Sequence, residues 1–119
     1  MSYGLTMEKV FYSIREVGQM FGLNESTLRF WEKEFEDIIA PQKNAHGKRF
    51  YSEEDIKNVR LVFYLLKTRK MTIAGARQKL KDNKAETVNR EAIYHRLEKV
   101  RDELHLIINT LDDYEKHLK

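Results

Sequence analysis

Apolar side chains recur at helical spacing along the first half of the chain, and capping residues mark where the predicted helices begin. Ser13 and Glu16 form a capping-box pattern, so a first helix is predicted to start at this point. Ile14, Val17 and Phe21 follow at intervals of three and four residues and form its apolar stripe. The stripe is expected to be buried against a neighbouring element.

A second short helix is predicted directly after the first. Gly22 suits the left-handed conformation that ends a helix, and Asn24 can cap the helix that follows. This second helix is expected to run from about Glu25 to Phe35 or slightly beyond, and Pro41 marks the end of the region. The pattern is one of two short helices joined by about three residues.

A helical wheel divides the second helix into two faces. Leu28, Trp31 and Phe35 form an apolar stripe that is expected to face the first helix. The opposite face carries two cations, a hydroxyl and a ring, namely Arg29, Lys33, Ser26 and Phe30. Such a face suits the major groove of DNA, where arginine can address guanine edges and a ring can touch a thymine methyl group. The alternative is an ordinary solvated helix surface.

The stretch that follows is predicted to form a small β-hairpin, or wing. Asn44 and Gly47 bracket a turn, and Arg49, Phe50 and Tyr51 are expected to form the return strand. The tip of this hairpin is basic. A basic hairpin soon after two short helices favours a winged helix-turn-helix module, because such modules use these parts together on DNA.

Two more helices are predicted before residue 83. Ser52 and the acidic residues after it mark a helix start, and apolar positions follow at Ile56, Val59, Phe63 and Leu66. Thr72 is expected to cap a shorter helix whose inward-facing residues are Ile73, Ala76 and Leu80. Residues 83–88 are predicted to be a linker.

From about residue 89 the apolar positions alternate between steps of four and three. The members of this heptad seam are Ile93, Leu97, Val100, Leu104, Ile107, Leu111, Tyr114 and Leu118. The spacing, with no glycine or proline, predicts one long helix whose stripe is exposed in an isolated chain. A second copy of the same helix is the simplest partner that could bury this stripe, so the chain is predicted to form a homodimer through the seam.

Composition narrows the class of protein. The 119 residues contain no cysteine, which excludes disulfides and thiolate metal sites. Four histidines lack any spacing typical of metal ligands, so neither a metal nor another cofactor is expected. A glycine-rich phosphate loop, a serine elbow and a carboxylate pair are also missing from the sequence, and an enzyme is therefore not expected.

Charge and hydropathy suggest where the protein acts and on what. Net charge is +3, and residues 1–84 carry 16 basic and 11 acidic side chains, a net of +5. The basic excess makes the N-terminal part the candidate anion binder. The chain contains neither a membrane-length apolar run nor an apolar signal core, so no membrane partner and a cytoplasmic location are expected.

Two motifs in this order resemble the MerR family of bacterial transcription regulators. They are T-L-R followed by two aromatic residues and Glu at Thr27–Glu32, and R-aromatic-Y-S at Arg49–Ser52. With "MTIAGARQKL" and the heptad helix, the similarity covers about residues 11–119. It implies a winged helix-turn-helix head, a further helical pair, and a C-terminal helix that forms an antiparallel coiled coil with a second subunit. RNA polymerase is a further candidate partner by the same resemblance.

The resemblance assigns roles to individual residues. The recognition-helix arginine corresponds to Arg29, the paired aromatics to Phe30 and Trp31, and the wing arginine to Arg49. The family usually has two tyrosines in the aromatic pair, whose hydroxyls can meet phosphates. A glycine usual before the fourth helix is replaced by Lys70, and "EKEFEDIIAP" replaces the usual path into the wing.

The sequence therefore predicts a mainly α protein with a winged helix-turn-helix domain over residues 11–82 and a dimerisation helix over 89–119, preceded by a leader over 1–10. The expected function is that of a homodimeric regulator that binds an inverted repeat in double-stranded DNA. The residues expected to contact DNA are Asn24, Ser26, Thr27, Arg29, Phe30, Lys33, Lys43, His46, Lys48, Arg49 and Tyr51. The alternative is a helical adaptor that binds another protein through the heptad helix, and steep salt dependence of DNA binding distinguishes the two.

Overall fold

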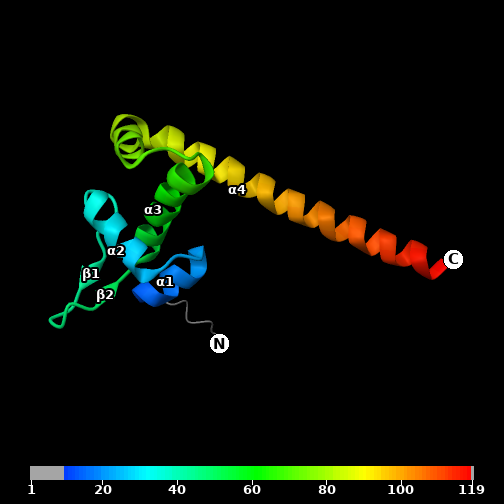
Figure 1. Cartoon of the computed structure of the whole chain (residues 1–119), viewed down its shortest axis with the longest axis horizontal. Helices are drawn as coiled ribbons and strands as arrows, with labels where there is room; N and C mark the ends of the chain where they lie inside the picture. Colours follow the sequence, from blue (N-terminus) through cyan, green and yellow to red (C-terminus); the bar gives the residue numbers. More distant parts are fainter. Residues whose placement is uncertain (1–9, 119) are drawn as a thin grey trace, which may run out of the picture. The chain divides into compact units, whose positions relative to one another are not determined.

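The structure is a computed structural model, and it describes residues 10–118 (Figure 1). Its elements in chain order are α1 (Ile14–Phe21), α2 (Glu25–Glu34), β1 (Gln42–Lys43), β2 (Arg49–Phe50), α3 (Glu53–Phe63), a π-helix η1 (Tyr64–Thr68) and α4 (Ile73–Leu118). The chain divides into two compact units, the first ending at Gln78 and the second beginning at Lys79. The predicted leader lies, apart from Val10, outside the described residues.

Helix α1 begins and ends as its sequence predicts. The Ser13 hydroxyl accepts from the Glu16 amide at 3.1 Å, and the Ser13 amide donates to Glu16 Oε1 at 3.0 Å. Gly22 closes the helix in the left-handed conformation at φ 65°. Val17 is fully buried, whereas Ile14 and Phe21 are half-buried. The first helix thus has the capping box, the terminator and the apolar face that the pattern indicates.

The buried stripe of α2 is confirmed. Leu28, Trp31 and Phe35 are at most 3% exposed. Asn24 occupies the N-cap position, but its side chain makes no capping hydrogen bond, so the predicted side-chain cap is wrong. Instead, the Asn24 carbonyl accepts from the Thr27 and Leu28 amides at 3.1 and 3.2 Å.

The chain leaves α2 through a tight turn that buries Ile39. The amides of Ile38 and Ile39 donate to the Phe35 carbonyl at 2.9 and 2.8 Å. The Asn58 side chain on α3 donates to the Ile38 carbonyl at 3.0 Å. A buried amide therefore fixes the path into the wing where the sequence departs from the family pattern.

The wing is a two-stranded antiparallel hairpin, as predicted. Lys43 is opposite Arg49 in the register, and Gly47 adopts φ 78° in the turn. The Asn44 side chain accepts from the His46 and Lys48 amides, both at 2.9 Å, and so stabilises the turn. Tyr51 follows β2 as an isolated bridge to Tyr12, with both backbone hydrogen bonds at 2.8 Å.

Helix α3 is the central element of the first unit. Ser52 and Asp55 form its capping box, with the Ser52 hydroxyl accepting from the Asp55 amide at 3.1 Å. The ring of Phe63 lies 5.6 Å from that of Phe21 and 6.5 Å from that of Trp31, between centroids. These three rings join α1, α2 and α3 into one core.

The predicted stripe of α3 is too narrow. Ile56 and Val59 are buried as expected, but Val62 and Leu65 are more deeply buried than Phe63 and Leu66. The structure buries the helix on more than one side, as the burial of Leu61 on α3 also shows. A single apolar stripe is typical of a helix that packs on the surface of a core. A helix in the centre of the core is buried on several sides.

Helix α4 starts at the predicted cap, where the Gly75 amide donates to the Thr72 hydroxyl at 3.0 Å. The prediction of a linker over 83–88 is wrong, because within α4 the backbone leaves the helical region only at Asn83 (φ −153°, ψ 72°). The Asn83 side chain accepts from the Glu86 amide at 3.1 Å, so it caps the helical part that follows. Figure 1 shows that α4 then continues unbroken to its C-terminal end.

The heptad seam is exposed along this last part of α4. Its members, the eight predicted residues from Ile93 to Leu118, are each 44–70% exposed. None of the helices within residues 10–118 is long and apolar enough to cross a membrane. The helix thus presents an unpartnered apolar stripe in the single chain.

Candidate nucleic-acid interface

The outward face of α2 is the face that the helical wheel predicts. Ser26, Arg29 and Lys33 are exposed, and Phe30 is 50% exposed. Asn24 is exposed just before the helix, and Thr27 in its first turn is half-buried. Folding therefore places a cationic surface with one ring on the side of α2 opposite Leu28 and Trp31.

Arg29 forms a weak ion pair within its own helix. Its terminal nitrogen lies 3.4 Å from Glu25 Oε1, and about half of each side chain is exposed, at 51% and 45%. Exposed pairs between residues four apart stabilise a helix by only about 0.3–0.5 kcal/mol. A phosphate or a guanine edge can therefore compete for this guanidinium.

The wing contributes a second cationic surface. Lys43, His46 and Lys48 are all exposed on β1 and the turn. The Lys48 ammonium lies 5.9 Å from the centroid of the Phe50 ring, a cation–π arrangement. The hairpin thus carries solvent-accessible positive charge at its tip.

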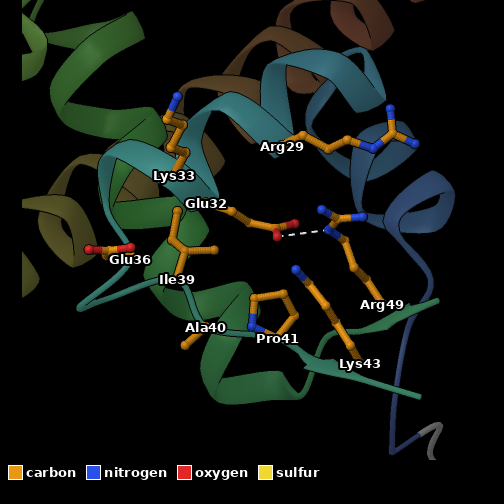
Figure 2. Close-up of a pocket in the computed structure, with 9 residues that line it drawn as sticks. All are labelled: Arg29, Glu32, Lys33, Glu36, Ile39, Ala40, Pro41, Lys43 and Arg49. Atoms are coloured by element: carbon orange, nitrogen blue, oxygen red, sulfur yellow. Dashed lines mark hydrogen bonds and ion pairs between the residues drawn. The ribbon is translucent and has the colours of Figure 1, made fainter. Parts of the chain in front are cut away.

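Arg49 on β2 is joined to α2 by a short ion pair. Its Nε donates to Glu32 Oε1 at 2.7 Å, and the two side chains are 21% and 10% exposed. Figure 2 shows the two residues facing each other from opposite sides of a hollow. The wing arginine that the sequence assigns to DNA therefore uses part of its guanidinium within the protein.

Tyr51 is buried, which corrects its predicted role. Its side chain is fully buried, and its hydroxyl donates to Glu32 Oε2. Burial, and then the hydrogen bond to the negatively charged Glu32, raise the pKa of the Tyr51 hydroxyl well above its usual value of 10.0. The Tyr51 hydroxyl is thus enclosed beneath the surface between α2 and the wing.

Glu32 is the residue that the sequence-based prediction missed. Both of its carboxylate oxygens accept hydrogen bonds, one from Arg49 and one from Tyr51. The available signal was its place at the end of the Thr27–Glu32 motif, three residues after Arg29. Its partners lie 17 and 19 residues further along the chain, so local spacing could not identify them.

The space between α2 and the wing is a hollow of about 300 Å³, which we call the α2–wing hollow. It is lined by Arg29, Glu32, Lys33, Glu36, Ile39, Ala40, Pro41, Lys43 and Arg49 (Figure 2). Four of these side chains are cationic and two are acidic, so the lining of the hollow carries a net positive charge. Such a surface suits an anionic backbone.

Within the described residues no three histidine or acidic side chains gather closely enough to hold a metal ion. Besides the two carboxylates of Glu32 and Glu36, the α2–wing hollow is lined by four cationic side chains that can donate hydrogen bonds. Cationic donors of this kind can bind an anion by charge-assisted hydrogen bonds.

Comparisons with known proteins identify a family and similar solved structures. The sequence model of the family described as "MerR HTH family regulatory protein" matches residues 12–83. A similar solved structure is HiNmlR, a MerR family regulator lacking the sensor domain, bound to promoter DNA. It is 18% identical over 89% of this chain and 91% of that chain, with a TM-score of 0.51, which shows a shared fold.

A second similar structure is a transcriptional regulator of the MerR family from Bacillus thuringiensis. It is 27% identical over 92% of this chain and 91% of that chain, with a TM-score of 0.43. No curated protein sequence matches the chain.

Proposed function

The chain belongs to the MerR family of helix-turn-helix regulatory proteins, and we propose that it acts as a homodimer on an inverted repeat in promoter DNA. Membership makes it a DNA-binding regulator rather than an enzyme. The single observation that carries the proposal is the two-faced α2, with Trp31 at 3% exposure and Phe30 at 50%. A helix anchored on one face and cationic on the other can enter a major groove without losing its packing.

The residues of α2 have separable roles on DNA. Arg29 reads a base edge, because a guanidinium can donate two hydrogen bonds to guanine in the major groove. Phe30 contacts an apolar part of the DNA, such as a thymine methyl group. Lys33 and Ser26 contact phosphates or bases on either side, as do Asn24 and Thr27 at the start of α2.

The wing binds the backbone next to the major-groove contact. Lys43 and Lys48 neutralise phosphates, and His46 at the tip reaches a phosphate or the minor groove. Arg49 also contacts a phosphate, through the guanidinium nitrogens that do not bind Glu32. Contacts of this kind fix the register of the protein on the duplex and leave sequence selection to α2.

The heptad seam favours a second copy of this chain in antiparallel orientation. The seam consists of two alternating sets of positions. One set contains only leucines, Leu97, Leu104, Leu111 and Leu118. Each of them follows by four residues a member of the other set, which is Ile93, Val100, Ile107 and Tyr114. Parallel two-stranded coils favour β-branched residues in the set that leucine occupies here. An antiparallel pair instead places each leucine opposite a member of the other set, with Leu104 opposite Ile107 when all eight positions overlap.

One solved relative supports the proposal. HiNmlR shares the fold and is of similar length, and it is bound to promoter DNA in its own structure. The activity of such a regulator at a promoter requires RNA polymerase as a second partner. DNA that is bent and untwisted between half-sites would allow the dimer to act on promoter spacing.

Selection of bound sequences from random duplexes, followed by footprinting, tests the proposed function. The expected result is an inverted repeat that is protected on one face of the duplex. The affinity should fall steeply with salt, because phosphate contacts release counterions. A direct repeat would contradict the dimer symmetry. Salt-insensitive binding to a protein, with no selected DNA, would identify the helical adaptor instead.

A further inference from the structure

Glu32 is an acidic residue in a surface that is otherwise suited to DNA. Its side chain is 10% exposed and lines the α2–wing hollow among four cations. A carboxylate in this position repels phosphate and therefore opposes DNA binding by electrostatics alone. A role in DNA binding that offsets this repulsion must therefore come from the contacts of Glu32.

The hydrogen bonds of Glu32 connect the protein core to the wing. One carboxylate oxygen accepts from the hydroxyl of Tyr51, whose side chain is fully buried. The other accepts from Nε of Arg49 at 2.7 Å. Backbone hydrogen bonds to Tyr12, at 2.8 Å in both directions, hold Tyr51 in turn. Glu32 is thus fixed by the core, and Arg49 is fixed by Glu32.

The hydrogen bond to Glu32 orients the whole guanidinium group of Arg49. A guanidinium is a rigid plane with five N–H donors, so engaging Nε determines the direction of the terminal nitrogens. The unheld side chain would sample many rotamers and would lose that freedom on binding. A guanidinium that is already oriented binds a phosphate without this entropic cost.

We propose that Glu32 is a positioning residue for DNA binding, which orients the Arg49 guanidinium toward a backbone phosphate. This inference rests on the proposed function. The opposing view is that Glu32 is only a negative charge near the DNA. The two views predict opposite signs for the effect of neutralising this carboxylate.

Glu36 provides the matched control. It lines the same hollow as Glu32 and is exposed, but it does not share the bonds of Glu32 to Arg49 and Tyr51. Glu36→Gln and Glu32→Gln change the charge of the protein equally. A difference in the sign of their effects on affinity therefore measures positioning and not charge.

The experiment measures the Kd of the full chain for its selected operator duplex, at a temperature where every variant is folded by circular dichroism. Glu36→Gln is expected to bind about twofold tighter, since one repulsive charge is removed. Glu32→Gln is expected to bind roughly tenfold more weakly, since the orientation of one charge-assisted contact is lost.

A double-mutant cycle with Arg49→Gln separates positioning from a general structural role. Once Arg49 no longer carries a guanidinium, Glu32→Gln should no longer weaken binding and should instead act like Glu36→Gln. A purely structural role would weaken binding in both backgrounds and would contradict the proposal.

Arg49→Lys gives an independent measurement if Glu32→Gln does not fold. Lysine keeps the charge but lacks the planar fork, so binding is expected to weaken by about tenfold. The proposal is overturned if Arg49→Lys binds as tightly as the unchanged protein, or if Glu32→Gln binds as tightly as Glu36→Gln. Failure of the unchanged protein to select any duplex would instead refute the proposed function.

Discussion

Gly18 and Leu23 are in backbone contact across the turn between α1 and α2. The Leu23 amide donates to the Gly18 carbonyl at 2.8 Å, and the Leu23 carbonyl oxygen lies 2.7 Å from where a Cβ on Gly18 would stand. A methyl group at this position would collide with backbone, which cannot rotate away as a side chain can. The close approach of α1 and α2 therefore depends on glycine.

Gly18→Ala is expected to lower the free energy of unfolding by about 1–3 kcal/mol, because a well-packed turn must move to admit the methyl group. Urea unfolding followed by circular dichroism measures the change. Gly75→Ala is the control, since a Cβ there would meet only the side chains of Thr72, at 3.0 Å, and Met71, at 3.6 Å. Equal stability of the two variants would contradict the packing argument.

Lys70 adopts a positive φ of 57° just before α4. A side chain in the left-handed region costs roughly 1–2 kcal/mol, and glycine removes this cost but adds entropy to the unfolded chain. Lys70→Gly is therefore expected to raise the free energy of unfolding by up to about 1 kcal/mol. Thermal unfolding measures it, and Lys70→Ala, which keeps the strain, should show no such gain.

The two faces of α2 can be separated by mutation. Trp31→Ala should lower the free energy of unfolding by about 3–5 kcal/mol, because it removes a buried ring, and DNA binding should fail with the fold. Arg29→Ala should leave thermal unfolding nearly unchanged and should lose about 1–3 kcal/mol of discrimination at one base position. The reverse pattern, in which Arg29→Ala unfolds the protein and Trp31→Ala only weakens binding, would refute the assignment of faces.

The absence of cysteine from the sequence makes crosslinking a clean test of the proposed dimer. Leu104→Cys mixed with Ile107→Cys should give a covalent dimer under mild oxidation, because an antiparallel pair with full overlap places these positions opposite each other. Leu104→Cys alone should not crosslink efficiently, whereas a parallel pair would bring two copies of this position together. A monomer by light scattering at micromolar concentration would contradict the homodimer itself.

The Lys79 ammonium lies 2.7 Å from Glu86 Oε1, across the non-helical Asn83. The hydrogen bond and positive charge of Lys79 hold the pKa of Glu86 below its usual value of 4.5. A carboxyl whose pKa is lowered in the folded state stabilises the fold at pH values above its pKa in the unfolded state. This contribution is lost as the pH falls through its pKa in the folded state. An NMR titration should give a pKa below 4.5 for Glu86 and a higher one in Lys79→Gln. An unchanged titration in that variant would exclude Lys79 as the cause.

The sequence by itself determined those secondary-structure elements that depend only on residues close together in the chain. Capping boxes at Ser13 and Ser52 set the starts of α1 and α3, because a cap acts over three residues. The division of α2 into a buried and an exposed face follows from helical periodicity, and so does the exposed seam of α4. The turn of the hairpin wing also depends on local residues. The wing and the outward positions of Arg29, Phe30 and Lys33 could therefore be predicted from the sequence.

Only the tertiary structure decided what lies between α2 and the wing. Spacing placed Arg49 and Tyr51 on one return strand and assigned both to DNA, but folding buries Tyr51 and binds both side chains to Glu32 on α2. The burial of Val62 and Leu65 likewise depends on the elements that surround α3. A periodic pattern records which way a side chain points from its own element, whereas its partners are set by segments that are distant in the chain and close in space.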